Sequence, residues 1–456
     1  MSANNKFSVH DKIIVTITGL GSSGEGVGKV DGFTVFAQGA LPGETVEVEL
    51  EIVKKNYAAG AVTAIIEAAS ERVEPLCPVY EECGGCQLQH LSYAGQLAAK
   101  EQQVRDALQR IGHLQAVKVL PIIGEDDPWY YRNKMQFPVA TETGTLEIGC
   151  YAASTHQVVD VASCRIQKQR NNDIVAAARQ WMAQYEVPAY DEKTGKGVVR
   201  HLMGRVGVNT GEVMAVIITS GYDLPHSKEL IKMLREAVPG LKSVVQNINK
   251  KQTNIVMGTK TRLLYGKNTI RDRLGTLKFN ISAQSFFQVN SAQAEKLYNT
   301  AVEFAALTGN ETVIDCYCGT GTISLYLAKH AKKVYGVEII APAIEDARRN
   351  ADDNRCENAE FILGDAAVKM QELTEQGVRP DVVLLDPPRA GCDEKVLAAI
   401  AQVQPQRIVY VSCNPASLAR DLAYLEHNGY QATLAQPVDM FPMTHHVECV
   451  VQVVRK

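Results

Sequence analysis

The spacing of hydrophobic and polar residues changes along the chain, and each spacing predicts a different kind of element. In residues 7–66, β-branched residues alternate with polar ones in short segments separated by glycine-rich turns, such as residues 21–26. Alternation with a period of two is typical of strands with one buried face. Several short strands of this kind favour a small closed β-barrel, which either binds single-stranded nucleic acid or serves as an interaction module.

After the predicted barrel, apolar residues recur with the spacing of a helix. The apolar residues of segment 92–113 recur at helical spacing and predict one amphipathic helix. Residues 129–275 mix predicted strands with one predicted helix near 171–185, and their pattern carries no catalytic signature. The apolar residues that define the first helix are Leu97, Val104, Leu108 and Ile111.

From about residue 283, predicted strands alternate with predicted helices. The strand candidates are TVIDCY, KVYGVEI, AEFILGD, DVVLLDP and RIVYVSC, followed by a β-rich end, HHVECVVQVV. This alternation predicts an α/β fold, a parallel sheet with helices on both faces and ligands at the carboxyl ends of its strands. The three expected parts are a barrel over 1–70, a central α+β domain over 71–92 and 125–275, and the α/β domain over 93–124 and 276–456.

Composition narrows the class of protein. The 456 residues are 46% hydrophobic and 21% charged, which is ordinary for a soluble protein of two or three domains. No apolar run approaches the roughly 20 residues that span a bilayer, and the N-terminal segment lacks the hydrophobic stretch of a signal peptide. We expect a cytoplasmic protein without a membrane partner. The formal net charge of −4 argues against nucleic-acid binding driven by bulk charge but allows a local basic surface.

Acidic residues end four of the predicted parallel strands. Asp315 ends the first and runs into the turn 319–321, a G-x-G sequence that opens a helix and lets a nucleotide approach the backbone closely. Glu338 ends the second strand, where it can accept hydrogen bonds from both ribose hydroxyls. An NAD-binding domain uses the same geometry. Two features favour S-adenosylmethionine over NAD. The glycine turn lacks the third glycine of an NAD-binding motif, and the next two strands end in the acidic residues Asp365 and Asp386.

Two residues at the predicted strand edges are candidates for catalysis. Cys413 follows the fifth strand and precedes a proline that begins a helix, and a helix N-terminus lowers the pKa of a thiol and makes it nucleophilic. The alternative is a buried and inert cysteine. Glu448 enters the last strand pair, where it either faces the same cleft or is a solvated carboxylate at a strand edge.

Eleven cysteines are many for a cytosolic protein, and three of them stand within ten residues. Cys77, Cys83 and Cys86 have the spacing C-x5-C-x2-C and favour either zinc or an iron–sulfur cluster, both of which need a fourth ligand. Cys164 is the best candidate for that ligand and Cys150 the next. The chemistry of the sequence leaves zinc and iron–sulfur open.

Five motifs stand in a fixed order: SFFQVN at 285–290, DCYCGTGT at 315–322, DPPRAG at 386–391, SCNP at 412–415 and FPMTHHVE at 441–448. The ordered set resembles the RNA uracil-5-methyltransferases, over essentially the whole chain. The resemblance implies a Rossmann-like class I methyltransferase domain, S-adenosylmethionine as methyl donor, Cys413 as nucleophile and Glu448 as base. The cofactor contacts that it implies are Gln288, Tyr317, Thr322, Glu338, Asp365 and Asp386.

Longer members of that family carry a TRAM barrel, thought to bind RNA, and a structural [4Fe–4S] cluster. The resemblance therefore implies a cluster on Cys77, Cys83, Cys86 and Cys164. Because the tRNA-specific branch generally lacks both features, we expect a monomeric enzyme that acts on 23S ribosomal RNA. The residues 130–134, YYRNK, are an aromatic and basic group that can stack on bases and hold phosphates.

Three other functions compete with this interpretation. The chain could be a catalytically silent RNA-binding iron–sulfur module, against which the intact Cys413 and Glu448 speak. It could methylate a tRNA uridine instead of a ribosomal one. Methylation of cytosine would require a cysteine in the fourth-strand loop, where this chain has Pro387 and Pro388.

Overall fold

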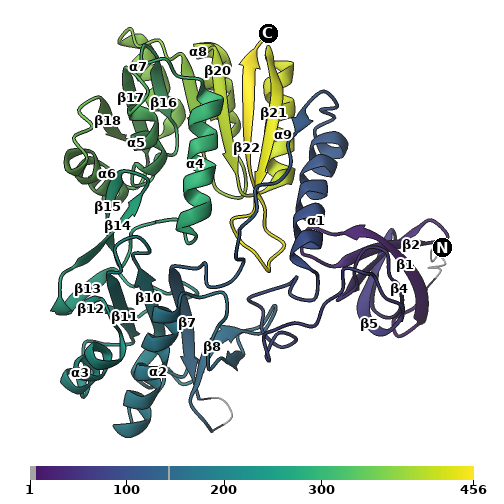
Figure 1. Ribbon diagram of the computed structural model, residues 1–456, viewed down its shortest axis with the longest axis vertical. Helices are drawn as coiled ribbons and strands as arrows, with labels where there is room; N and C mark the ends of the chain where they lie inside the picture. The colour runs from purple at the N-terminus through teal and green to yellow at the C-terminus, as the bar shows by residue number, and fades with distance from the viewer. Residues whose placement is uncertain (1–6, 142–143) are drawn as a thin grey trace.

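The computed structural model describes residues 7–141 and 144–456. Residues 1–6, which belong to the segment expected to lack a signal peptide, lie outside the described part. Figure 1 shows a large sheet at the top, a second sheet below it and a small barrel to one side. In the described ranges, no helix is both long enough and apolar enough to cross a membrane.

The N-terminal strands form a closed barrel in the order β1-β2-β3-β5-β4, as predicted. Alternate side chains such as Val15, Val35 and Val48 point inward and are fully buried. Gly60 of β5 lies so close to β4 that a Cβ there would stand 2.0 Å from the carbonyl oxygen of Glu49, so the barrel closes only with glycine at this position. The strands are β1 (Lys12–Leu20), β2 (Gly26–Val30), β3 (Phe33–Gln38), β4 (Thr45–Val53) and β5 (Tyr57–Glu67).

The central part is a seven-stranded sheet in the order β13-β12-β11-β10-β7-β8-β9. Two helices cover one face, α2 (Gln169–Gln184) and α3 (Ser227–Ala237). Only α2 was predicted, so the prediction of a single helix in this region was wrong. The strands are β7 (Lys134–Ala140), β8 (Glu147–Tyr151), β9 (Val158–Asp160), β10 (Val199–Val206), β11 (Val213–Thr219), β12 (Leu241–Ile248) and β13 (Lys260–Gly266).

The C-terminal part is an eight-stranded sheet in the order β18-β17-β16-β19-β20-β22-β21-β6. The five strands from the β18 edge to β20 are parallel, and β22 enters antiparallel to β20. Helices α4, α5 and α6 cover one face, and α7, α8 and α9 cover the other. The strands are β6 (Lys118–Val119), β16 (Thr312–Asp315), β17 (Lys333–Glu338), β18 (Ala359–Leu363), β19 (Val382–Leu385), β20 (Arg407–Ser412), β21 (Tyr430–Val438) and β22 (Glu448–Arg455).

The helices of this part are α4 (Ser291–Ala305), α5 (Thr322–Ala328), α6 (Ala341–Asp353), α7 (Ala366–Glu375), α8 (Glu394–Val403) and α9 (Pro415–His427). The hairpin of β14 (Thr269–Leu274) and β15 (Leu277–Ser282) packs between the two large sheets, with its apolar side in the same core as α4 and β11. One continuous core therefore joins the central sheet to the C-terminal one.

The predicted helix over 92–113 is α1 (Tyr93–Asp106), which continues as the π-helical turn η1 (Ala107–Ile111). Val104 and Leu108 are buried as predicted, but the rest of the buried face differs from the prediction. Gln96 and Lys100 are 1% exposed, whereas the predicted core residue Ile111 is 49% exposed. Figure 1 shows α1 standing between the barrel and the C-terminal sheet. The buried polar residues have partners in the loop that precedes β22, and those partners lie far away in the sequence.

Candidate active site

The turn after β16 has the geometry of a nucleotide site. Asp315 is 1% exposed, accepts a hydrogen bond of 2.5 Å from the Ser324 hydroxyl, and has its pKa raised to about 6 by burial. Gly319 and Gly321 have φ angles of +53° and +80°, a region that favours glycine. A Cβ at Gly321 would stand 2.8 Å from the Phe361 ring. The space beside Gly319 is open, whereas Gly321 lets the turn pack closely against Phe361.

Glu338 closes the turn from the next strand. Its carboxylate accepts the backbone N–H of Gly319 at 3.2 Å and of Ile340 at 3.0 Å, and each oxygen keeps a lone pair for a further donor. Ile339 and Ile340 beside it are 70% and 57% exposed, which is unusual for large apolar side chains at a sheet edge. An apolar surface beside a carboxylate suits a nucleoside, whose flat base is apolar on its faces and whose ribose carries hydroxyls.

The other predicted cofactor residues surround this turn. Asp365 caps α7 by accepting the N–H of Val368, and its side chain is exposed. Tyr317 is half-buried, and burial raises its pKa. Thr322 begins α5 and accepts a hydrogen bond from Tyr298.

The segment 285–290 lies against the same turn. The Thr320 hydroxyl donates to the carbonyl oxygen of Phe286 at 3.4 Å, and the Asn133 side chain donates to the carbonyl oxygen of Gln288 at 2.9 Å. These contacts fix the backbone of Gln288 between the nucleotide turn and the central sheet.

Cys413 lies directly after β20 and before α9, which Asn414 caps. The thiol is half-buried, and its pKa is raised to about 11 by desolvation and by the carboxylates of Glu448 and Asp386, against the opposing charge of Arg389. The predicted lowering of this pKa by the helix terminus is therefore wrong. Two nearby carboxylates and burial outweigh the helix dipole, whose effect is modest.

Glu448 begins β22, only one strand away from Cys413, and is 5% exposed. Burial raises its pKa to about 7, and the Arg389 guanidinium acts in the opposite direction. The alternative of a solvated carboxylate is thus wrong. A group with a pKa near neutrality is suited to taking and releasing protons. Asp386 completes the group, and desolvation together with the Glu448 and Asp315 charges raises its pKa well above the usual range.

Arg389 was not predicted from sequence, although it stands in the DPPRAG motif. Its guanidinium lies 3.2 Å from Nε2 of His446, and its charge acts on both Cys413 and Glu448. The site therefore combines a thiol, two carboxyl groups and one cation at the carboxyl edge of the sheet.

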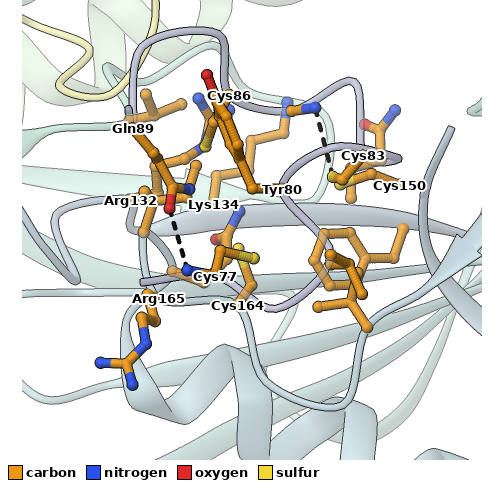
Figure 2. A pocket seen from close by; sticks show the side chains of 18 residues that line it. Cys77, Tyr80, Cys83, Cys86, Gln89, Arg132, Lys134, Cys150, Cys164 and Arg165 are labelled. Atoms are coloured by element: carbon orange, nitrogen blue, oxygen red, sulfur yellow. Dashed lines mark hydrogen bonds between the residues drawn. The ribbon is translucent and has the colours of Figure 1, made fainter. Parts of the chain in front are cut away.

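Five cysteines line one cavity of about 400 Å³ between the segment 77–89 and the central sheet. Figure 2 shows the thiols of Cys83 and Cys150 facing each other, with Cys77 and Cys164 in the middle of the cavity. The Cys150 thiol donates to Cys83, which lowers the pKa of Cys83 to about 7. Across the described ranges, no three Cys, His, Asp or Glu side chains adopt an arrangement that holds a metal ion.

The cysteine segment contacts the loop that carries the catalytic candidates. The N–H groups of Gln87 and Leu88 both donate to the carbonyl oxygen of Met443 at 3.0 Å. Tyr131 is 4% exposed and donates to the carbonyl oxygen of Pro442, and Asn133 is also buried. The predicted role of residues 130–134 in stacking on RNA is therefore wrong for these two side chains, which are structural.

Comparison with known proteins agrees with this geometry. The family model described as tRNA (uracil-5-)-methyltransferase matches residues 92–456. The chain belongs to this family. A TRAM domain model matches residues 8–63, the region of the barrel. The enzyme is thus an RNA uracil-5-methyltransferase with a class I methyltransferase fold that uses S-adenosylmethionine, as the motifs predicted.

The family resemblance extends over whole chains. An uncharacterized RNA methyltransferase of Halalkalibacterium halodurans is 51% identical over 97% of this chain and 96% of its own. One of Caldanaerobacter subterraneus is 50% identical over 99% of this chain and 100% of its own. The crystal structure of Pyrococcus abyssi tRNA (uracil-54, C5)-methyltransferase with S-adenosyl-L-homocysteine has a TM-score of 0.78 at 28% identity, and covers 97% of this chain and 99% of that one.

Proposed function

We propose that this methyltransferase modifies carbon 5 of a uridine through a covalent bond between Cys413 and the base. The observation that carries the proposal is the convergence of the Cys413 thiol, the Glu448 carboxyl group and the Arg389 guanidinium beside the nucleotide turn. The half-buried thiol is accessible to a base, while Glu448 is shielded from water.

The reaction explains why these side chains are needed. Carbon 5 of uracil is a weak nucleophile, so the Cys413 thiolate adds to carbon 6 and converts the ring to an enolate. Carbon 5 of the enolate then takes the methyl group from the sulfonium of S-adenosylmethionine. Glu448 removes the remaining hydrogen from carbon 5 as a proton, and the electron pair expels the thiolate. The Arg389 cation is placed to favour the anionic forms of both side chains.

We propose the same cofactor contacts that the family resemblance implies. We assign the ribose hydroxyls to Glu338, the adenine amino group to Asp365 and the reactive end of the cofactor to Asp386. Gln288, Tyr317 and Thr322 complete the set. The exposed apolar side chains beside Glu338 support the assignment, because they form a surface for the adenine ring. We also propose that the chain divides into a barrel domain, a central domain and a methyltransferase domain, with the bounds given in the sequence analysis.

We propose further that the cysteine cavity holds a [4Fe–4S] cluster on Cys77, Cys83, Cys86 and Cys164. The fit rests on the donor set, since these thiols line one cavity and mutual thiolate repulsion contributes to the raised pKa of Cys86. These four thiolates would hold the cluster, and the cluster would tie segment 77–89 to the central sheet. Cys150 lines the same cavity and is the alternative ligand.

The cluster is tested by metal analysis of anaerobically purified protein. We expect a brown protein with about four iron and four sulfide per chain, the composition of one such cluster. Replacing any of the four proposed ligands by serine removes the absorbance, whereas Cys150→Ser retains it. Stoichiometric zinc without iron would overturn the assignment.

The substrate that we propose is 23S ribosomal RNA, with a tRNA uridine as the alternative. The expectation rested on a barrel and cluster that the tRNA branch generally lacks. The Pyrococcus enzyme, named for tRNA, matches 97% of this chain, so length does not separate the two substrates. Mass mapping of both RNA classes from a strain lacking the protein decides between them.

The covalent mechanism is tested with the pair Glu448→Gln and Cys413→Ala. The first variant adds the thiolate and transfers the methyl group but does not remove the proton, so a protein–RNA adduct accumulates on natural RNA. The second forms no adduct, even with RNA containing 5-fluorouridine, which traps the wild type. Normal turnover by Glu448→Gln would show that another group is the base. Full activity of Cys413→Ala would refute the covalent mechanism. A silent RNA-binding module would transfer no methyl group in any of these assays.

A further inference from the structure

An exposed tyrosine on the central sheet is surrounded by cations. Tyr222 follows β11 and is 46% exposed. The ammonium groups of Lys250 and Lys260 lie 4.9 Å and 5.7 Å from the centroid of its ring, within the range of cation–π attraction. Lys251 and Arg262 are exposed beside them in the sequence. Together, Tyr222, Lys250, Lys251, Lys260 and Arg262 form the Tyr222 patch.

The cations of the Tyr222 patch have no acidic partners. Among the residues that the structure describes, Lys250, Lys251, Lys260 and Arg262 form no ion pair, while other surface cations do, such as Lys12 with Glu47. The chain as a whole carries a net charge of −4. Two ammonium groups over one exposed ring, with two further unpaired cations close to them in the sequence, are therefore a local basic surface on an acidic protein, which favours a polyanionic partner.

The loop that carries the lysines is rigidly held. Arg200 is 4% exposed, and its guanidinium donates to the carbonyl oxygens of Asn249 at 2.9 Å and Lys251 at 2.7 Å. The Asn249 side chain donates in turn to the carbonyl oxygens of Ile255 and Val256. A buried cation thus fixes the loop before any partner binds, so little ordering entropy is lost on binding.

The Tyr222 patch is connected to the active site through short contacts. The Gln284 side chain donates to the carbonyl oxygen of Gly258, two residues before Lys260. Gln284 in turn stands two residues before Phe286, whose carbonyl oxygen is held by the nucleotide turn. Segment 258–286 therefore links the Tyr222 patch to the nucleotide turn.

We propose that the Tyr222 patch is a second RNA-binding surface, which stacks an unpaired base on Tyr222 and holds the flanking phosphates with its four cations. The proposal rests on the proposed function, since it concerns the same RNA substrate outside the target uridine. Aromatic rings that stack bases beside cations that neutralise phosphates are the elements with which proteins hold single-stranded RNA. A docked acidic protein is the alternative partner, and it would leave RNA affinity unaffected.

The test measures binding of the full-length protein to a fluorescent RNA hairpin with a uridine-containing loop and a single-stranded extension. Lys250→Gln/Lys260→Gln should weaken binding about tenfold at 0.1 M salt, and each lost phosphate contact should reduce the slope of log affinity against log salt by about 0.7. Tyr222→Ala should also weaken binding, and Tyr222→Phe should not. The matched control is Lys332→Gln/Lys456→Gln, which removes two charges at the opposite edge of the C-terminal sheet.

Two readouts separate this proposal from the proposed function. In the patch variants kcat for methyl transfer should stay at the wild-type value while KM for RNA rises, because the catalytic residues are unchanged. Wild-type affinity and salt slope in both patch variants would overturn the patch and leave the covalent mechanism standing. A wild-type protein that methylates no uridine would overturn the proposed function by itself.

Discussion

Replacing Glu448 by glutamine should stabilise the folded protein at alkaline pH. The pKa of this carboxyl group is raised from its ordinary value of 4.5 to about 7 by burial. Between these two values the folded protein binds a proton that the unfolded chain releases, so stability falls as the pH rises from about 4.5 to 7. The shift of roughly 2.5 units corresponds to about 3 kcal/mol at pH 8. Glutamine has no charge to bury and avoids this cost.

The measurement is urea unfolding of wild type and Glu448→Gln, followed by circular dichroism at pH 4.5, 6 and 8. The difference in free energy of unfolding between the variants should grow by about 3 kcal/mol over this range. Glu375→Gln, a change at the end of α7, is the control and should show a much smaller dependence. A difference that is constant with pH would refute the reasoning, because it would mean that Glu448 ionises normally in the folded state.

Four further predictions follow from other contacts. In Glu448→Gln the pKa of Cys413 should fall below about 11, because the Glu448 carboxylate contributes to raising it; the pH dependence of iodoacetamide alkylation measures this pKa. In the wild type, kcat/KM should rise with pH through about 7, as the Glu448 carboxyl group loses its proton and becomes a base. Lys100→Met should destabilise the protein by about 3–5 kcal/mol, because it leaves Asp439 buried and unpaired, whereas Arg110→Met at an exposed pair should cost less than about 1 kcal/mol. Gly321→Ala should abolish binding of S-adenosylhomocysteine in calorimetry, since its φ of +80° and the Phe361 ring both oppose a Cβ.

Sequence patterns predicted the parts of the fold that depend on local spacing. The five central strands of the C-terminal sheet appear where apolar runs end in acidic or polar residues, because buried parallel strands are continuously apolar. The barrel followed from alternation in the same way. α3 was missed although its apolar residues Leu230 and Leu234 are fully buried, because strands surround this short segment on both sides.

Features that depend on distant residues could not be predicted. Lys100 looks like a surface residue of an amphipathic helix until Asp439 is placed 2.6 Å from it. The same limit explains the wrong direction for the Cys413 pKa. The helix terminus was visible in the sequence, but the two carboxylates that outweigh it come from separate strands. Tyr131 likewise looked like a surface aromatic residue because its partner, Pro442, follows more than 300 residues later.

The loop between β21 and β22 explains how the cysteine cavity bears on catalysis. Residues 439–443 are held from one side by α1, where Lys100 pairs with Asp439 and donates to the carbonyl oxygen of Phe441. They are held from the other side by the cysteine segment, whose two N–H groups bind the carbonyl oxygen of Met443. Met443 also packs with Cys86 and Cys164. Because Glu448 follows directly after this loop, whatever fixes the cysteines also fixes Glu448, the proposed base. Uracil methylation transfers no net electrons, so the proposed cluster acts by holding this loop, and its loss should lower kcat through Glu448 before it affects binding of the cofactor.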